Sequence, residues 1–514
     1  MKLSKDKTVI IVVYILAYGS TLLNNGLYWD DWTLYHVPAA TIIKTFMQNG
    51  SYWPGPLHVA LLALPYNIMI YRIIVLLAFL ACTFLVYELL RTIKQIDSFS
   101  RMVITTLFAI YPVNAARELL ITLPYALCNL AFFIGFWLLA CYMIYGKIRT
   151  RVLALLCFLF AFFTNSILVF YSIVLIYIYY IERQNPKPKS LLGMIKAYLD
   201  FLIIPVLFGI IKLVFLKPYG IYKGYDSVNL HGFLALNRTL LTGVYNSFPA
   251  VIHDSMSNLS LITLFFWLAI AIGLFKLLGK SKASLNWPFV IFGIFALIIG
   301  ILPYCVVNKL PSPIGWETRN ELLVPLGASF IIYYIIKMIL DKVKAKTYIA
   351  IAVYALIIAV FVGANIHNAD TYQRDWYKQL ALIENFKHSS VIRDNTTFLF
   401  DDHTPNLSVP GTSIGFYEYN GMMKLAFGDQ TRFGERITMQ FKDLRDYARF
   451  IPYEEYNMKD YKIRPAQFIV TVLPGNYNIS SYRSLFKLEY LQFFNPIEFK
   501  KDIRELVKLQ YVKL

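Results

Sequence analysis

Two adjacent carboxylates follow the first apolar segment of the chain. Asp30 and Asp31 lie between Trp29 and Trp32 in the stretch NNGLYWDDWTLYH, residues 24–36. A carboxylate can act as a general base when it lies within hydrogen-bond reach of the proton that it removes. Two close carboxylates do not both ionise easily unless hydrogen bonds or a cation compensate. The pair therefore suits a base with an orienting partner, or a divalent cation such as Mg²⁺ or Mn²⁺. The alternative is a solvated loop in which both aspartates cap a helix.

The composition indicates what kind of molecule positions this pair. The 514 residues are 58% hydrophobic and 16% charged, and apolar stretches of spanning length recur up to about residue 364. Lipid admits only helices and closed barrels, and long continuous apolar runs exclude a barrel, whose strands would alternate. The sequence therefore predicts an all-α polytopic membrane protein. Its net charge of +18 is explained by Lys and Arg that flank the spans, so no nucleic-acid partner is expected.

We predict about eleven transmembrane helices. The apolar run 152–181 is too long for one span and is interrupted by TNS at Thr164–Ser166, so it predicts two short helices. The other nine spans are expected at 8–24, 66–90, 102–113, 120–145, 192–216, 259–278, 286–305, 322–340 and 347–364.

Charge asymmetry predicts the orientation. Lys and Arg concentrate in one set of loops, which should be cytoplasmic together with the N-terminus. The acidic pair would then lie on the outer face of a cell membrane, as would the loops 217–258 and 306–321. With an odd number of spans, the C-terminus is also outside. We therefore expect a transmembrane module, residues 1–364, and an extracytoplasmic domain, residues 365–514.

The C-terminal domain is expected to be a small α/β unit. TYQRDWYKQLALIENFKH, residues 371–388, is typical of an amphipathic helix, and TTFLF and QFIVTVL are typical of strands. A second acidic pair, in FDDH at residues 400–403, follows a strand and predicts a turn.

The residues around the first acidic pair carry a resemblance to a known family. YWDDW, then the amphipathic stretch WTLYHVPAATIIKTFMQNG, then WPGPL before the second span resemble the GT-C superfamily of integral-membrane glycosyltransferases. This family includes protein O-mannosyltransferases, aminoarabinose transferases and serotype-converting glucosyltransferases. PGPL at Pro54–Leu57 is similar to the KPPL motif of the aminoarabinose transferases, but Pro54 stands in place of its lysine. The serotype-converting enzymes are therefore the nearer resemblance.

The resemblance implies a function. The donor would be a polyprenyl-phosphate sugar, and the acceptor a glycan, lipid or protein at the outer face, among membrane lipids. Asp30 matches the family's presumed base, and Asp31 matches its second acidic residue. As the acceptor hydroxyl attacks the anomeric carbon, Asp30 would take its proton, and direct displacement would invert that centre.

The departing phosphate requires a cation, and arginines are scarce in the predicted outer loops. Arg117, Arg238 and Arg319 are the candidates, because a planar guanidinium suits phosphate oxygens. The alternative is an ion pair, Arg117 with Glu118 and Arg319 with Glu317 or Glu321.

Other side chains could contact the sugar or the donor. Tryptophan faces stack on sugars in a cavity, so Trp29, Trp32, Trp53 and Trp316 are candidates. His58 lies near the expected donor entrance, although a structural hydrogen bond is the alternative role. Two other functions stay open: a flippase or transporter for a lipid-linked glycan, and an O-antigen-type polymerase or ligase.

Overall fold

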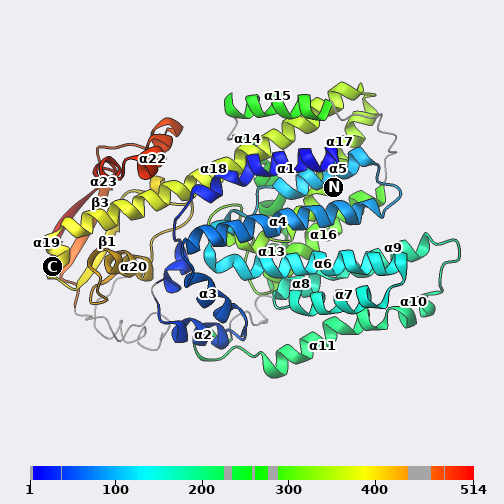
Figure 1. The fold of residues 1–514 in the computed structure, drawn as a ribbon, viewed down its shortest axis with the longest axis horizontal. Helices are drawn as coiled ribbons and strands as arrows, with labels where there is room; N and C mark the ends of the chain where they lie inside the picture. The colour runs from blue at the N-terminus through cyan, green and yellow to red at the C-terminus, as the bar shows by residue number, and fades with distance from the viewer. Residues whose placement is uncertain are drawn as a thin grey trace.

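Long helices form a bundle, and a small sheet lies beyond one end of it (Figure 1). The computed structural model describes residues 4–35, 37–224, 234–257, 261–275, 287–437, 465–479 and 481–514. Within these residues, seven helical segments are long and apolar enough to cross a membrane, as the composition predicts for a polytopic membrane protein. They contain α1 (Lys5–Tyr18), α4 (Asn67–Arg91), α6 (Leu123–Tyr145), α8 and α9 (Asn165–Phe170 and Ser172–Arg183), α16 (Trp287–Val306), α17 (Val324–Lys342) and α18 (Thr347–His388).

The other predicted spans correspond to shorter or bent helices. The pair α10 (Leu191–Ala197) and α11 (Leu199–Phe215) makes an eighth span if the two helices, bent by 61°, are counted as one. The remaining three are α5 (Ser98–Ile110), α7 (Ile148–Ala161) and α15 (Leu261–Phe275). They are short of the ~20 residues that a straight span needs, so the count of eleven stays a prediction. The ends of the span expected at 259–278 lie outside the described residues. The break that TNS predicts is confirmed, because α7 ends at Ala161 and α8 begins at Asn165.

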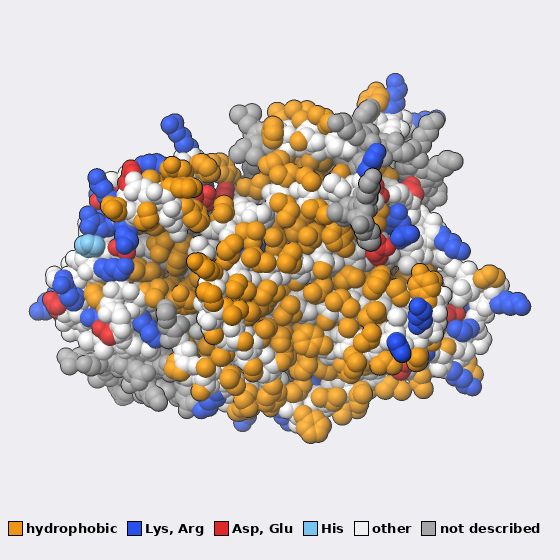
Figure 2. Space-filling view, in the orientation of Figure 1, with side chains coloured by type: hydrophobic (Ala, Val, Ile, Leu, Met, Phe, Trp, Pro, Cys, Tyr) orange, Lys and Arg blue, Asp and Glu red, His pale blue; other side chains and the backbone are white. Residues whose placement is uncertain are grey.

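The surface of the bundle is that of a membrane protein. Hydrophobic side chains cover its middle as a broad belt, and Lys and Arg gather beyond both ends of the belt (Figure 2). Leu77, Leu156, Val206 and Leu213 are each about half exposed or more. Soluble proteins rarely expose contiguous apolar surface of this extent, whereas lipid covers it.

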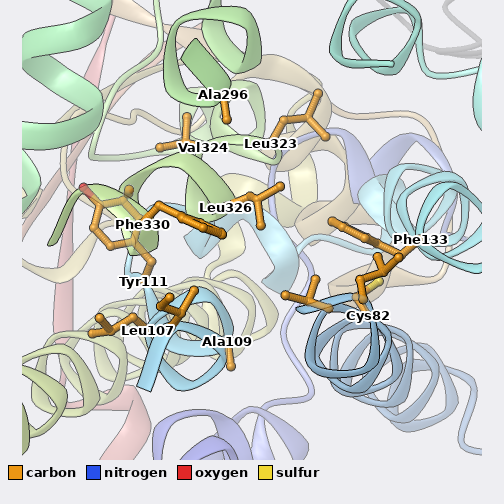
Figure 3. Close-up of a cluster of buried hydrophobic side chains, with 14 of the residues drawn as sticks. Cys82, Leu107, Ala109, Tyr111, Phe133, Ala296, Leu323, Val324, Leu326 and Phe330 are labelled. Atoms are coloured by element: carbon orange, nitrogen blue, oxygen red, sulfur yellow. The ribbon is translucent and has the colours of Figure 1, made fainter. Parts of the chain in front are cut away.

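Small residues let the helices approach closely inside the bundle. A Cβ on Gly327 of α17 would lie 2.4 Å from the Leu297 nitrogen of α16 and 2.7 Å from the Gly293 oxygen. Close backbone approach of this kind is how helices pack in lipid, where the hydrophobic effect between them is weak. Figure 3 shows part of the resulting core, to which α4, α5, α6, α16 and α17 contribute Cys82, Leu107, Phe133, Ala296 and Phe330.

Short elements form a layer at the end of the bundle that adjoins the sheet. The stretch after α1 contains the 3₁₀ segments η1 (Gly19–Leu23) and η2 (Trp29–Thr33), then α2 (Ala39–Gln48) and α3 (Pro54–Leu62). The amphipathic stretch that follows the acidic pair forms a helix, α2. The rest of the layer comprises η3 (Ala115–Glu118), η4 (Leu120–Thr122), η5 (Gly220–Tyr222), α13 (Leu236–Tyr245), η6 (Asn246–Ala250), α14 (Val251–Ser257) and η7 (Trp316–Glu321).

The C-terminal part is an α/β unit, as predicted. Its strands are β1 (Thr397–Asp402), β2 (Phe433–Arg436), β3 (Phe468–Pro474) and β4 (Val507–Lys513), in the order β2-β1-β3-β4. β1 is parallel to both β2 and β3, and β4 is antiparallel to β3. TTFLF and QFIVTVL are thus confirmed as strands, but the turn expected for FDDH is wrong for its two aspartates, which end β1. The remaining elements are α19 (Ser390–Asp394), η8 (Pro405–Leu407), α20 (Phe416–Phe427), α22 (Tyr482–Phe494) and α23 (Pro496–Arg504).

A single helix joins the two parts. The span expected at 347–364 and the helix expected at 371–388 are one unbroken helix, α18, of 42 residues. It packs on α1, α5 and α15 in the bundle and on α20, α23 and β4 in the C-terminal part (Figure 1). The domain boundary expected at residue 365 therefore falls inside α18, which belongs to both parts.

Candidate functional site

The acidic pair lies on η2, and its two members have different surroundings. Asp31 is fully buried, and its carboxylate oxygens accept hydrogen bonds from the backbone N–H groups of Tyr28 (3.2 Å) and Ile121 (2.9 Å). Burial raises the pKa of Asp31 to about 6, against the backbone hydrogen bonds, which lower it. Asp30 is only half-buried. Asp31 therefore fastens η2 to η4, and Asp30 is the member of the pair that solvent reaches.

A buried ion pair holds the backbone just before η2. Arg72 of α4 and Glu118 of η3 lie 3.5 Å apart with side chains 2% and 4% exposed. The guanidinium also donates to the backbone oxygens of Asn24 (3.3 Å) and Gly26 (3.1 Å), just before η2. The Arg117–Glu118 pair that the sequence suggested is thus replaced by Arg72–Glu118. Arg72 lies in an apolar run 46 residues before Glu118 in sequence, so nothing local indicates that the two meet.

Aromatic side chains and an arginine meet beside Asp30. The rings of Trp29 and Trp316 stack with centroids 6.3 Å apart and planes 13° apart. The guanidinium carbon of Arg319 lies 4.3 Å from the centroid of the Trp29 ring, a cation–π contact. The structure thus brings three of the predicted residues together, although nearly 290 residues separate Trp29 from the other two.

The two terminal nitrogens of the Arg319 guanidinium have different surroundings. Its Nη2 lies 3.2 Å from Glu317, which confirms one of the two ion pairs suggested for it. Its Nη1 is buried and has no hydrogen-bond partner among the described residues. Leaving a buried guanidinium N–H unpaired is costly, so this nitrogen is suited to an anionic ligand.

The C-terminal part contributes a carboxyl group that the sequence analysis missed. Glu418 of α20 is buried and accepts hydrogen bonds from the N–H groups of Trp29 (3.1 Å) and Gly415 (2.7 Å). Trp29 has a φ of +49°, a left-handed conformation that is strained for a bulky side chain. Glu418 therefore holds the strained residue next to Asp30. No motif around Glu418 indicates this contact, because it is made across 389 positions of the chain.

Glu418 should make stability depend on pH. Burial and, to a smaller extent, the charges of Asp375 and Asp30 raise its pKa from 4.5 to about 8, against two backbone hydrogen bonds that lower it. Because the folded pKa exceeds the unfolded one, the protonated group contributes stability that is full below about pH 4.5 and is lost as the pH rises through about 8. We therefore expect the melting temperature of the wild type to fall from pH 6 to pH 8.5 relative to that of Glu418→Gln. Parallel curves would contradict this, and exposed Glu498→Gln is the control.

Comparison of the sequence with known protein families and curated proteins does not assign it to a family. No family model and no curated protein matches this sequence. The likeness to GT-C enzymes therefore remains a resemblance.

Trp32 and His58 are buried side chains. Trp32 donates from its indole nitrogen to Gln379 of α18 (3.0 Å), and a Cβ on Gly421 of α20 would lie 2.2 Å from its ring. It therefore packs η2 against the C-terminal part. His58 lies with its Nδ1 2.8 Å from the Tyr71 hydroxyl group, and burial lowers its pKa to about 3. This imidazole is neutral near pH 7. Its hydrogen bond to Tyr71 is the structural role that the sequence analysis gave as the alternative to contact with the donor.

The two other candidate arginines lie in different settings. The Arg117 guanidinium carbon lies 3.9 Å from the Tyr18 ring centroid and 4.5 Å from that of Phe79, and its Nε donates to the Asn114 backbone oxygen. These contacts hold Arg117 inside the bundle. Arg238 is exposed on α13, which packs on α16.

A cavity of about 200 Å³ adjoins the aromatic group. Gly315, which precedes Trp316, and Tyr372, whose ring lies 5.8 Å from that of Trp316, are in its wall. The rest of the wall comes from α14 and α18, from Ala115 of η3 and from the loop residues Pro112, Pro313, Ile314, Val409 and Pro410. Asp30, Asp31 and Arg319 are not among its lining residues, so the site and this cavity are neighbours. The described residues contain no group of three or more His, Cys, Asp or Glu side chains that could hold a metal ion.

Proposed function

We propose that this protein is an inverting glycosyltransferase that moves a sugar from a polyprenyl-phosphate donor to a hydroxyl group of a glycan, lipid or protein on the outer face of the membrane. The observation that carries the proposal is the meeting of Arg319 with Trp29, the neighbour of Asp30, at one end of a membrane-spanning bundle. A half-buried carboxylate, a guanidinium with an unpaired N–H and stacked indole rings are the groups that this reaction needs.

Each group has a role in the proposed reaction. Asp30 takes the proton of the acceptor hydroxyl as its oxygen bonds to the anomeric carbon. Arg319 stabilises the negative charge on the phosphate oxygen as its bond to that carbon breaks. Asp31, held by two backbone N–H groups, fixes the position of Asp30. The stacked pair of Trp29 and Trp316 gives the site an aromatic wall against which a sugar ring can lie.

The membrane orientation is part of the proposal. Lys-rich loops predict that the end of the bundle opposite the sheet is cytoplasmic. The acidic loop and the C-terminal α/β unit would then face the exterior, where a lipid-linked sugar presents its head group. About eleven spans, as in the enzymes that the sequence resembles, would give this arrangement.

The Arg72–Glu118 pair favours a second candidate, a transporter for a lipid-linked glycan. Ionisable groups buried in membrane proteins often mark a transport path. However, Arg72 lies in the second turn of α4 and Glu118 lies in η3, at the end of the bundle rather than at its centre. A transporter would move a labelled lipid-linked sugar across the bilayer without consuming it, whereas a transferase would release the sugar to an acceptor.

The proposal is tested with the purified protein in liposomes that contain radiolabelled polyprenyl-phosphate hexoses and a cell-envelope acceptor fraction. We expect label to pass to the acceptor, and Arg319→Gln to slow this transfer by about 10²-fold, the usual cost of removing a charge-stabilising donor. Exposed Arg393→Gln is the matched control and should transfer at the wild-type rate. Transfer from oligosaccharide donors alone would instead indicate a polymerase or ligase. Transbilayer movement without transfer would overturn the proposal.

A further inference from the structure

Helix α22 of the C-terminal part exposes a stripe of large apolar side chains. Tyr482, Phe486, Tyr490 and Phe494 recur every four residues and are 44–73% exposed. Phe493 and, just beyond the helix, Ile497 extend the stripe with exposures of 53% and 84%. Residues at this spacing share one face of a helix. A water-facing helix rarely carries such a surface, so this face has a partner.

The opposite face of α22 is packed against the rest of the protein. Leu485, Leu488 and Leu491 are buried in the core of the C-terminal part. Gln492 accepts a hydrogen bond from Tyr377 of α18 (3.1 Å). The aromatic stripe is therefore not the face by which α22 packs on the C-terminal part.

The position of α22 along α18 indicates what its exposed face meets. The start of α22 lies beside α18: burial raises the pKa of the Tyr482 hydroxyl group, and Asp370 and Arg374 are close enough for their charges to affect it. Asp370 follows the end of the apolar stretch at Ala364 by six residues, or about 9 Å at the rise of an α-helix. Polar head groups extend about 5–8 Å beyond the hydrocarbon core, so α22 begins at the outer side of the head-group region. Figure 2 accordingly shows hydrophobic side chains over α22 at the edge of the C-terminal part, next to the apolar belt.

Charges near the stripe fit the same partner. Arg483, Lys500 and Lys501 are exposed on α22 and α23. Phospholipid head groups offer phosphates to such cations, and tyrosine and phenylalanine rings concentrate at the boundary between lipid and water.

We propose that α22 lies in the lipid–water interface of the membrane and docks the C-terminal part on it, with Tyr482, Phe486, Tyr490 and Phe494 among the head groups. The partner is the phospholipid surface itself. The proposal needs only the membrane-spanning bundle and does not depend on the reaction proposed above.

The test uses the full-length protein in phosphatidylcholine liposomes with about a quarter of an anionic phospholipid, a composition chosen to include the charged head groups that attract Lys and Arg. A polarity-sensitive fluorophore is attached at Phe486→Cys, in a background where the five native cysteines are replaced by alanine. We expect lipids with a spin label near the head group to quench about half of its emission, because interfacial helices bury their apolar face some 5–10 Å deep. Lys513→Cys, exposed at the end of β4, is the control and should be quenched by aqueous iodide instead.

Other outcomes would overturn the proposal. If iodide quenches the probe at Phe486→Cys as strongly as the probe at Lys513→Cys, α22 faces water. If neither quencher reaches it, a second copy or another protein covers the stripe. Adding Tyr490→Asp to the labelled protein supplies a second measurement, since a charge at the stripe should lower quenching by the spin-labelled lipid toward the control value. The melting temperature of this variant shows whether it is folded.

Discussion

Replacing Asp30 by asparagine is expected to slow sugar transfer by about 10²–10⁴-fold, the usual contribution of a general base. Asparagine has nearly the shape of aspartate but cannot take a proton. Asp30 is half-buried and asparagine has nearly its shape, so the melting temperature should stay close to that of the wild type. The rate is measured in the liposome assay described above, and the melting temperature by tryptophan fluorescence in detergent.

The same substitution at Asp31 distinguishes a catalytic role of Asp30 from a structural one. Asp31→Asn should lower the melting temperature, because one amide oxygen cannot serve the backbone N–H groups of both Tyr28 and Ile121. Exposed Asp394→Asn should change neither quantity. Undiminished transfer by Asp30→Asn would remove Asp30 from the role of base. An equal loss of melting temperature in Asp30→Asn and Asp31→Asn would show that Asp30 is structural.

Replacing Arg72 by methionine is expected to lower the free energy of unfolding by about 3–5 kcal/mol, the typical cost of breaking a buried ion pair. The substitution leaves Glu118 buried without its cation and releases the two carbonyl groups that Arg72 holds before η2. Burial already raises the pKa of Glu118, so in the variant this carboxyl group is neutralised readily by a proton. The loss should accordingly be largest at high pH and shrink as the pH falls. Thermal melting in detergent between pH 5 and pH 8 measures it.

Two variants control this prediction. Arg91→Met removes an arginine from the same helix, but its side chain is 69% exposed and its partner, Glu88, is 3.4 Å away. An exposed pair of this kind contributes about 0–1 kcal/mol, so this variant should melt close to the wild type. Adding Glu118→Gln to Arg72→Met should recover part of the loss, because no unpaired charge is then buried. A double variant that is no more stable than Arg72→Met would show that the carbonyl contacts, and not the ion pair, determine the stability.

The fold was predictable wherever one segment determines its own structure. Continuous apolar runs gave the bundle helices, the TNS break gave two helices where one span was too long, and two β-rich runs gave β1 and β3. β2 and β4 escaped prediction because the polar run FGER and the alternating run VKLQYVK become strands only by pairing with β1 and β3. The single helix α18 escaped as well, since a change from apolar to polar composition resembles a domain boundary even where the backbone continues unchanged.

The candidate site was predictable only in part. Asp30 and Asp31 form a local motif, and the scarcity of arginines in the loops predicted to be outside pointed to Arg319. The different surroundings of the two aspartates depend on where the N–H groups of η4 lie, which no local pattern records. Arg72, Glu118 and Glu418 become important through contacts between distant segments, and charged residues of these types occur throughout the chain.

The continuity of α18 limits how the two parts of the molecule can move. Its 42 residues extend about 63 Å without a break, so the connection offers no hinge. A change in the tilt of this helix, such as a thicker or thinner bilayer imposes, would swing the C-terminal part through the same angle and pull on the Glu418–Trp29 contact. We therefore expect the position of the loop that carries Asp30 to respond to the thickness of the surrounding membrane.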